Sequence, residues 1–296
     1  MSIPGLTIIG ERINPGFAST RALLEKQDLP GLQALAVSQK TKGAHYLTIN
    51  VGELAQQDTK FLADLIRAVQ EVCDLPLSFD YPNRAVQEVC LRTFDPTKAG
   101  GRRPIVNSVT ELRWDMLEVL KIQPARVVLM ASERMENNQA VANLNGREIA
   151  DTARRMVDRV LNEGTGLTKD DLLIDLSLGP IASDTDGVVR RGVEAIQLIN
   201  RDPEMRGVHR MVGLSNLGIM LPKLALDGGP LPTRIESAFL TLTMPHGLDT
   251  ILGTPGRSYQ LLPEDDFVFR GFCEVLKAEG FDALEKVQHL YQSNGQ

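Results

Sequence analysis

Residues 172–216 read LLIDLSLGPIASDTDGVVRRGVEAIQLINRDPEMRGVHRMVGLSN and contain one complete strand–helix–strand unit. The apolar runs at 172–175 and 210–214 have the length and composition of parallel strands that are covered on both faces. Between them, residues 187–200 carry apolar side chains at three- and four-residue intervals, as a helix packed against a sheet does. This helix ends before Pro203, because proline cannot continue the backbone hydrogen-bond ladder. The unit therefore predicts two parallel strands joined by a helix.

The same alternation runs through the rest of the chain. Further apolar runs predict strands at residues 6–10, 45–50, 75–79, 104–107, 126–130 and 248–252. Apolar periodicity predicts helices at residues 29–42, 60–72, 84–93, 109–122 and 146–161. Eight strands alternating with helices predict an α/β fold, a (β/α)8 TIM barrel with residues 1–296 as a single domain. A doubly wound open sheet is the alternative, although such sheets usually have fewer strands or a separate substrate domain. Surface loops are predicted at 95–103 and, over the barrel mouth, at 133–145.

The composition is that of an ordinary globular protein, with 43% hydrophobic and 24% charged residues and a net charge of −6. The charges are mixed, which excludes the basic stripe of a nucleic-acid-binding protein. No apolar run is long enough to cross a membrane, and the first residues lack the features of a signal peptide, so we expect a cytoplasmic protein. We expect reduced, buried thiols at Cys73, Cys90 and Cys273. A metal site is not expected, because ligand spacing is missing at His45, His209, His246 and His289.

Acidic and amide residues stand where most of the predicted strands stop. They are Glu11, Asn50, Asp80, Asn107, Asp175 and Asn216, and the eighth apolar run contains Asp249. Because the carboxyl ends of all barrel strands face one mouth, these side chains should converge there. Turn preference explains any one of them equally well, since Asp and Asn are common turn residues. Acids and amides at so many strand ends are harder to explain in that way, and they predict a functional mouth.

The chemistry of these residues narrows the ligand. The sequence has no Gly-rich phosphate loop, no lysine cluster at the strand ends and no GxSxG motif. Carboxylates accept hydrogen bonds, and amides both donate and accept them, which suits a neutral polar heterocycle. A pterin fits this description, because its amino group and adjacent ring N–H form a donor pair that one carboxylate accepts through both oxygens.

Six short motifs occur in order and with barrel spacing: GERIN at 10–14, INVG at 49–52, FD at 79–80, NS at 107–108, ID at 174–175 and GLSN at 213–216. On these motifs the chain resembles, over roughly residues 6–255, the pterin-binding methyltransferases that act with corrinoid proteins. The fold of that family is the dihydropteroate-synthase-like pterin-binding barrel. The resemblance implies an enzyme that moves a methyl group by SN2 transfer between the cobalt of a separate corrinoid protein and N5 of tetrahydrofolate.

The resemblance also implies roles for particular residues. Asn216 matches the family's catalytic asparagine, which reaches towards N5. The pterin-binding residues that it implies are Asp80, Asn107, Asp175, Asn216, Asn50 and Glu11. The substrate would be tetrahydrofolate or 5-methyltetrahydrofolate, and the corrinoid would be carried by a partner protein that docks transiently over the mouth. The family further implies a homodimer and no metal held by the barrel.

Two alternatives remain on the same scaffold. Dihydropteroate synthases carry a lysine beside a Ser-Arg at strand seven and a late Arg-x-His, whereas this chain has Leu217 and Gly218 in GLSNLG and no Arg two residues before His246. The other alternative is a non-catalytic folate-binding or corrinoid-docking protein, which would have no need of a group aimed at N5.

Overall fold

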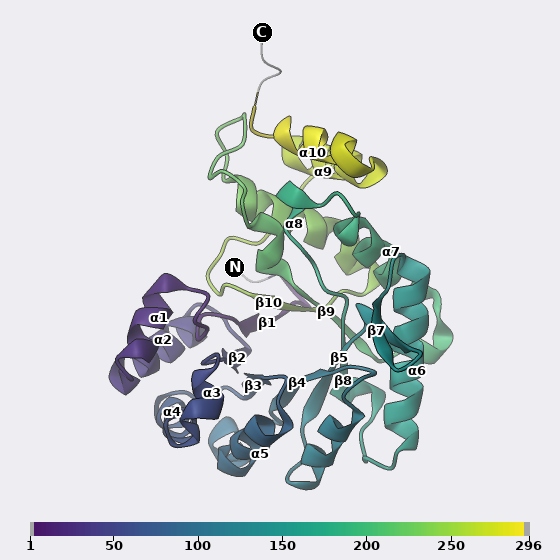
Figure 1. Cartoon of the computed structure of the whole chain (residues 1–296). Coiled ribbons are helices and arrows are strands. Elements are labelled where there is room, and N and C mark those ends of the chain that lie inside the picture. The colour runs from purple at the N-terminus through teal and green to yellow at the C-terminus, as the bar shows by residue number, and fades with distance from the viewer. Residues whose placement is uncertain (1–2, 293–296) are drawn as a thin grey trace.

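The computed structural model describes residues 3–292 and contains a closed barrel of eight parallel strands (Figure 1). Neighbouring strands follow the order β1-β10-β9-β8-β5-β4-β3-β2, which confirms the predicted TIM barrel and excludes the open sheet. The barrel strands are β1 (Thr7–Gly10), β2 (Tyr46–Ile49), β3 (Leu77–Asp80), β4 (Ile105–Val109), β5 (Arg126–Met130), β8 (Leu172–Asp175), β9 (His209–Gly213) and β10 (Thr250–Gly253).

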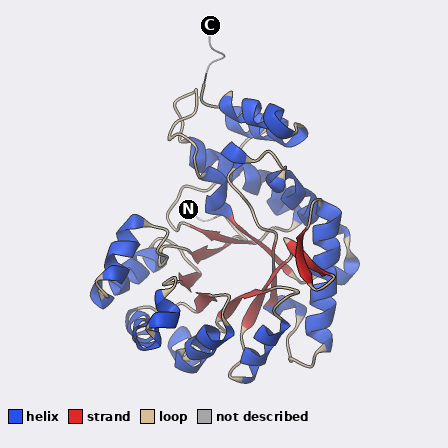
Figure 2. Cartoon of the chain, in the orientation of Figure 1, coloured by secondary structure: helices blue, strands red, loops and turns tan. Residues whose placement is uncertain are grey.

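Helices surround the ring of strands (Figure 2). The α-helices are α1 (Ala18–Glu25), α2 (Leu29–Thr41), α3 (Leu54–Gln57), α4 (Thr59–Val72), α5 (Arg84–Thr93), α6 (Gly146–Asn162), α7 (Val188–Arg201), α8 (Leu231–Thr243), α9 (Phe267–Lys277) and α10 (Gly280–Gln288). Short 3-10 helices are η1 (Pro96–Ala99), η2 (Trp114–Lys121), η3 (Lys169–Asp171), η4 (Ile181–Ser183), η5 (Pro203–Met205), η6 (Leu214–Gly218) and η7 (Met244–His246). The N-cap side chain accepts from a backbone N–H group at the start of α2, α4, α5, α6 and α9, where the N-cap residues are Asp28, Asp58, Asn83, Asn145 and Asp266. None of the described helices is both long and apolar enough to cross a membrane.

Alternation along the strands divides the core into two parts. One part lies between strands and helices and includes Leu47, Phe79 and Val127. The second part is a smaller cluster inside the barrel, formed by Ile9, Ile105, Val128, Leu173 and Met211 from five different strands. Successive side chains of a strand point to opposite sides, so each inward position is two residues from the next. The apolar inner cluster therefore fills the lower barrel and leaves the next inward position of several strands for polar residues.

The segment 109–122 does not form the predicted helix. Strand β4 continues to Val109, and helical structure begins only at η2. The reason is a set of local and long-range hydrogen bonds that compete with helix formation. The Thr110 hydroxyl accepts from the backbone N–H of Leu112 at 3.3 Å, and the buried Glu111 carboxylate accepts from Met135 N at 2.8 Å and Arg155 Nε at 3.1 Å.

The segment 133–145, predicted as a surface loop, contains a β-hairpin. Strands β6 (Glu133–Glu136) and β7 (Gln139–Ala142) pair antiparallel, beside α6 (Figure 1). Asn137 and Asn138 both have positive φ, at 51° and 62°, as the two central residues of a type I′ turn require. The Asn-Asn pair was the available signal, but the flanking strands lack the alternation that marks a half-buried hairpin. The other predicted loop, 95–103, contains η1.

Asp249 does not lie at the barrel mouth, because strand β10 begins only after it. Its carboxylate faces His209 at the start of β9, with 2.7 Å between Oδ2 and Nδ1, and the other ring nitrogen of His209 lies 3.2 Å from Asp170. These residues lie at the starts of their strands and belong to the amino-terminal face of the barrel. Side chains at that face serve stability rather than the site.

We predict that His209→Gln lowers the free energy of unfolding more at pH 6 than at pH 9. The hydrogen bond to Asp249 raises the pKa of His209 above its ordinary value of 6.5. This contribution to stability is complete below pH 6.5 and is lost as the pH rises through the higher folded-state pKa. The difference between the two pH values should be about 1 kcal/mol by urea denaturation. In an Asp249→Asn background most of this pH dependence should vanish, and its persistence would contradict the assignment.

Candidate functional site

Four predicted site residues meet at the carboxyl end of the barrel, on β3, β4 and β8 and directly after β2. Asp80 and Asn107 are paired across β3 and β4, both at inward-facing positions. Asn50 donates from Nδ2 to Asp80 Oδ2 at 3.0 Å and accepts at Oδ1 from Gly52 N at 2.8 Å. Asp175, at the end of β8, is also inward-facing and accepts from Ser177 N at 2.9 Å. We call Asn50, Asp80, Asn107 and Asp175 the acid–amide group.

Burial makes the carboxylates of this group costly to ionise. Burial raises the pKa of Asp80, and the hydrogen bond from Asn50 opposes that shift. Burial also raises the pKa of Asp175 from 3.8 to about 6, against the hydrogen bond from Ser177 and with a smaller contribution from the charge of Asp80. The two carboxylates are therefore close enough to repel each other. A pair of N–H donors on a ligand would stabilise their ionised forms.

The floor of the acid–amide group is also polar. Thr48 and Ser78 lie opposite each other on β2 and β3, one inward position below Asn50 and Asp80. Both hydroxyl oxygens are buried and have no hydrogen-bond partner among residues 3–292. Buried hydroxyls are ordinarily satisfied by protein, water or ligand, so this floor is suited to a flat ligand with ring heteroatoms.

Asn216 stands beside this group, in the short helix η6 that follows β9. Its Nδ2 donates to the Leu178 carbonyl at 3.1 Å, in the loop after Asp175. This bond fixes the amide and still leaves one N–H and the side-chain oxygen for other partners. A Cβ on Gly213 would lie 3.0 Å from Asn216 Nδ2, which is tighter than an ordinary contact. A glycine at 213 therefore leaves room for the asparagine side chain.

A pocket of about 500 Å³ opens next to Asn216, between the ends of β1, β9 and β10. We call it the rim pocket. Glu11, on its wall, is buried and accepts at Oε1 from the hydroxyl of Ser215 at 2.6 Å and from that of Thr254. The structure thus places Glu11 after β1, next to the strand that Asn50 follows, and Glu11 lines the rim pocket together with Asn216.

The sequence did not predict the roles of three residues in this region: Thr254, Arg257 and Glu236. Arg257 lines the rim pocket, and Glu236 of α8 pairs with its Nη1 from inside the protein. Burial raises the pKa of Glu236 to about 7, although the charge of Arg257 opposes this. A cation in the loop after the eighth barrel strand was the signal that could have identified Arg257.

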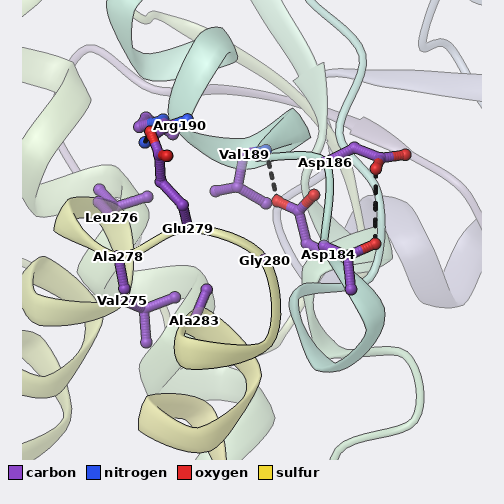
Figure 3. A pocket seen from close by; sticks show the side chains of 12 residues that line it. Asp184, Asp186, Val189, Arg190, Val275, Leu276, Ala278, Glu279, Gly280 and Ala283 are labelled. Carbon is purple, nitrogen blue, oxygen red and sulfur yellow. Dashed lines mark hydrogen bonds and ion pairs between the residues drawn. The ribbon is translucent and has the colours of Figure 1, made fainter.

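A second hollow lies away from the mouth, between the start of α7 and the helices α9 and α10 (Figure 3). Polar groups that line it already have hydrogen-bond or ion-pair partners within the protein. Both oxygens of Asp184 accept from backbone N–H groups at the start of α7, and Arg190 pairs with Glu279 at 2.9 Å. This hollow therefore has a structural role, as caps and pairs of this kind stabilise helix ends. Within residues 3–292, no three His, Cys, Asp or Glu side chains are grouped to hold a metal ion.

Comparison with known proteins agrees with this geometry. The model of a family described as pterin binding enzymes matches residues 10–252. The methylcorrinoid:tetrahydrofolate methyltransferase of Eubacterium limosum is 24% identical over 257 residues, which are 84% of this chain and 85% of that protein. The dihydropteroate synthase of Thermus thermophilus, solved with 6HMPPP, shares 17% identity over 88% of this chain and 92% of its own, with a TM-score of 0.58. That of Coxiella burnetii, solved with pteroic acid, shares 16% identity over 93% of each chain, also with a TM-score of 0.58.

We predict that Asp175→Asn stabilises the unliganded protein at pH 8. Because folding raises the pKa of Asp175 from 3.8 to about 6, the wild type loses stability as the pH rises through this window. A neutral amide of the same shape avoids that loss and should raise the free energy of unfolding by about 1–2 kcal/mol at pH 8. Urea denaturation at pH 8 and pH 4 measures the difference, which should shrink at pH 4. Asp151→Asn, on the exposed face of α6, is the matched control, and an equal gain in it would contradict the prediction.

Proposed function

The chain belongs to the pterin-binding enzymes, and from this premise we propose that it is a tetrahydrofolate–corrinoid protein methyltransferase. It would move a methyl group between the cobalt of a separate corrinoid protein and N5 of tetrahydrofolate. The name of the Eubacterium limosum relative supports this activity. The observation that carries the proposal is Asn216, an amide held at the barrel mouth by its bond to Leu178, three residues after Asp175.

In this proposal the acid–amide group binds the pterin ring. An ionised Asp80 or Asp175 accepts the amino group and the adjacent ring N–H, which form a matched donor pair for one carboxylate. Asn107 and Asn50 supply the mixed donors and acceptors that the other ring atoms need. The unpartnered hydroxyls of Thr48 and Ser78, described above for residues 3–292, support a heterocyclic ligand at this depth.

Asn216 is proposed to act at N5. In the direction towards folate, the N5 lone pair forms a bond to the methyl carbon, while the cobalt–carbon bond breaks and leaves its electron pair on cobalt. The proton of N5 leaves to solvent. In the opposite direction N5 is the leaving group and takes up a proton from solvent, and a hydrogen bond from a neutral amide stabilises the electron pair that develops there. The bond from Asn216 to Leu178 would hold the amide in place for either direction.

The corrinoid is a substrate carried by a partner, which would dock transiently over the mouth because it must also reach its own methyl donor or acceptor. We propose that residues 1–296 form one pterin-binding domain and that the protein is a homodimer. Dihydropteroate synthase activity is the competing proposal on this fold. Against it stands the end of β9, where Leu217 is buried and Gly218 has no side chain to contact an anionic leaving group.

We predict that Asn216→Ala slows methyl transfer much more than it weakens tetrahydrofolate binding. Loss of one hydrogen bond made in the transition state should lower the transfer rate about 10- to 100-fold, with less than about a threefold change in Kd. Transfer is measured by mixing the protein with 5-methyltetrahydrofolate and cob(I)alamin and following the cobalt spectrum. Ser183→Ala, at an exposed position of η4, is the control. An equal loss of rate and affinity would rule out the catalytic role, and pterin binding without any methylcobalt in the wild type would favour a mere binder.

We also predict that tetrahydrofolate binds more weakly as the pH falls below about 6. Asp175 accepts the pterin donors only as a carboxylate, and its pKa in the free protein is about 6. At pH 5 about one molecule in ten carries the ionised form, so Kd should rise about tenfold relative to pH 7.5. Fluorescence titration across this range measures the effect. Asp175→Asn should bind weakly at every pH, and a wild-type affinity that is flat from pH 7.5 to 5 would exclude Asp175 as the acceptor.

A further inference from the structure

Arg257 has unused hydrogen-bonding capacity at the wall of the rim pocket. Its side chain is 32% exposed, and Nη1 pairs with Glu236. A guanidinium carries five N–H donors in a planar fork that matches a carboxylate. Within the part of the chain that the structure describes, Glu236 is the ion-pair partner recorded for this side chain. The remaining donors are therefore available to a ligand in the pocket.

Glu236 holds this arginine from behind. Its side chain is 0% exposed, in the second turn of α8, and its Oε2 has no hydrogen-bond partner among residues 3–292. A fully buried carboxylate is costly unless a cation stays beside it, so Glu236 keeps the guanidinium at the pocket wall. The other arginine of this region, Arg234 in α8, is different, because Asp227 and Asp266 at 2.6 and 2.7 Å already occupy both of its terminal nitrogens.

The position of the rim pocket follows from that of Asn216. With the pterin ring on the acid–amide group and N5 at Asn216, the substituent on the adjacent ring carbon C6 would leave the ring near Asn216, which also lines the rim pocket. The rim pocket lies there, and it is lined by the apolar side chains of Phe17, Ile219, Pro232 and Leu252. A folate carries an aryl ring, an amide and a glutamate on C6, in that order. A pocket lined by apolar side chains and by one cation provides partners for both the aryl ring and the glutamate.

We propose that Arg257, positioned by Glu236, binds a carboxylate of the folate's glutamate, and that the rim pocket takes the aryl ring before it. This assignment rests on the proposed function and makes the site specific for folates over shorter pterins. Glu11 is an acid on the same pocket wall, and the hydroxyls of Ser215 and Thr254 already bond to its Oε1. Glu11 therefore accepts hydrogen bonds from the protein, whereas Arg257 is proposed to donate its remaining hydrogen bonds to the ligand.

The test compares tetrahydrofolate with tetrahydropteroate, which lacks the glutamate and ends in a carboxylate on the aryl ring. The wild type should bind tetrahydrofolate about tenfold more tightly, as one charge-assisted hydrogen bond would give. In Arg257→Gln this preference should fall to about onefold to twofold, with the Kd of tetrahydropteroate unchanged. Arg257→Lys keeps the charge without the fork and should retain a preference of about threefold. Arg234→Gln, on the same helix as Glu236 but outside the pocket, should keep the full preference.

Three results would overturn the assignment. A wild type that binds both ligands equally tightly has no glutamate subsite, although the proposed function would stand. An equal loss of both ligands in Arg257→Gln and Arg257→Lys, with folded circular dichroism spectra, would show that the arginine only supports the structure. A wild type that binds neither ligand would overturn the proposed function and this assignment with it.

Discussion

Every feature of the site depends on the two-residue alternation of side chains across the barrel wall. Outward side chains are apolar because helices cover them, and five strands contribute apolar side chains to the lower inward positions. Polar residues appear nearer the mouth, at inward positions such as Thr48 and Ser78 and at the last inward positions above them. Asp80, Asn107 and Asp175 all occupy such a position, which is why they converge although they are far apart in the sequence.

Placing two carboxylates together without a cation has an energetic consequence. Each acid is harder to ionise than in water, and Asp175 feels the charge of Asp80 as well as its own burial. The surrounding apolar core supplies the stability that offsets this local penalty. Across Asn216 the opposite arrangement is found, because there Arg257 lies beside the buried Glu236. The mouth thus has one side that attracts hydrogen-bond donors and another that attracts an anion.

The sequence predicts the barrel well because its signals are local and repeated. The strands at 126–130 and 172–175 and the helix at 84–93 match their predicted bounds, since short apolar runs and periodic helices report burial directly. Predictions failed where distant partners decide the local structure. Residues 109–122 do not form the predicted helix because Glu111 accepts hydrogen bonds from Met135 and Arg155. No local sequence pattern predicts these contacts.

The site residues divide in the same way, into those that a local sequence signal predicts and those that depend on distant contacts. Strand ends reveal the acids and amides, because their polar character interrupts an apolar run. Arg257 lies several residues beyond β10 in an ordinary-looking turn, and its relation to Glu236 exists only once α8 packs against that loop. The sequence signal for Arg257 is a single cation in the loop after the eighth barrel strand, and no motif marks its role.

The close approach of Gly213 to the amide of Asn216 also limits how this protein can change by mutation. A side chain at 213 is compatible with the structure only if the amide moves or has already been lost. Once a smaller residue replaces Asn216, the glycine is free to drift to alanine, and the path back then favours one order of reversals, with glycine restored at 213 before asparagine at 216. Loss of the asparagine would therefore act as a partial ratchet, because its direct return would meet a side chain at 213.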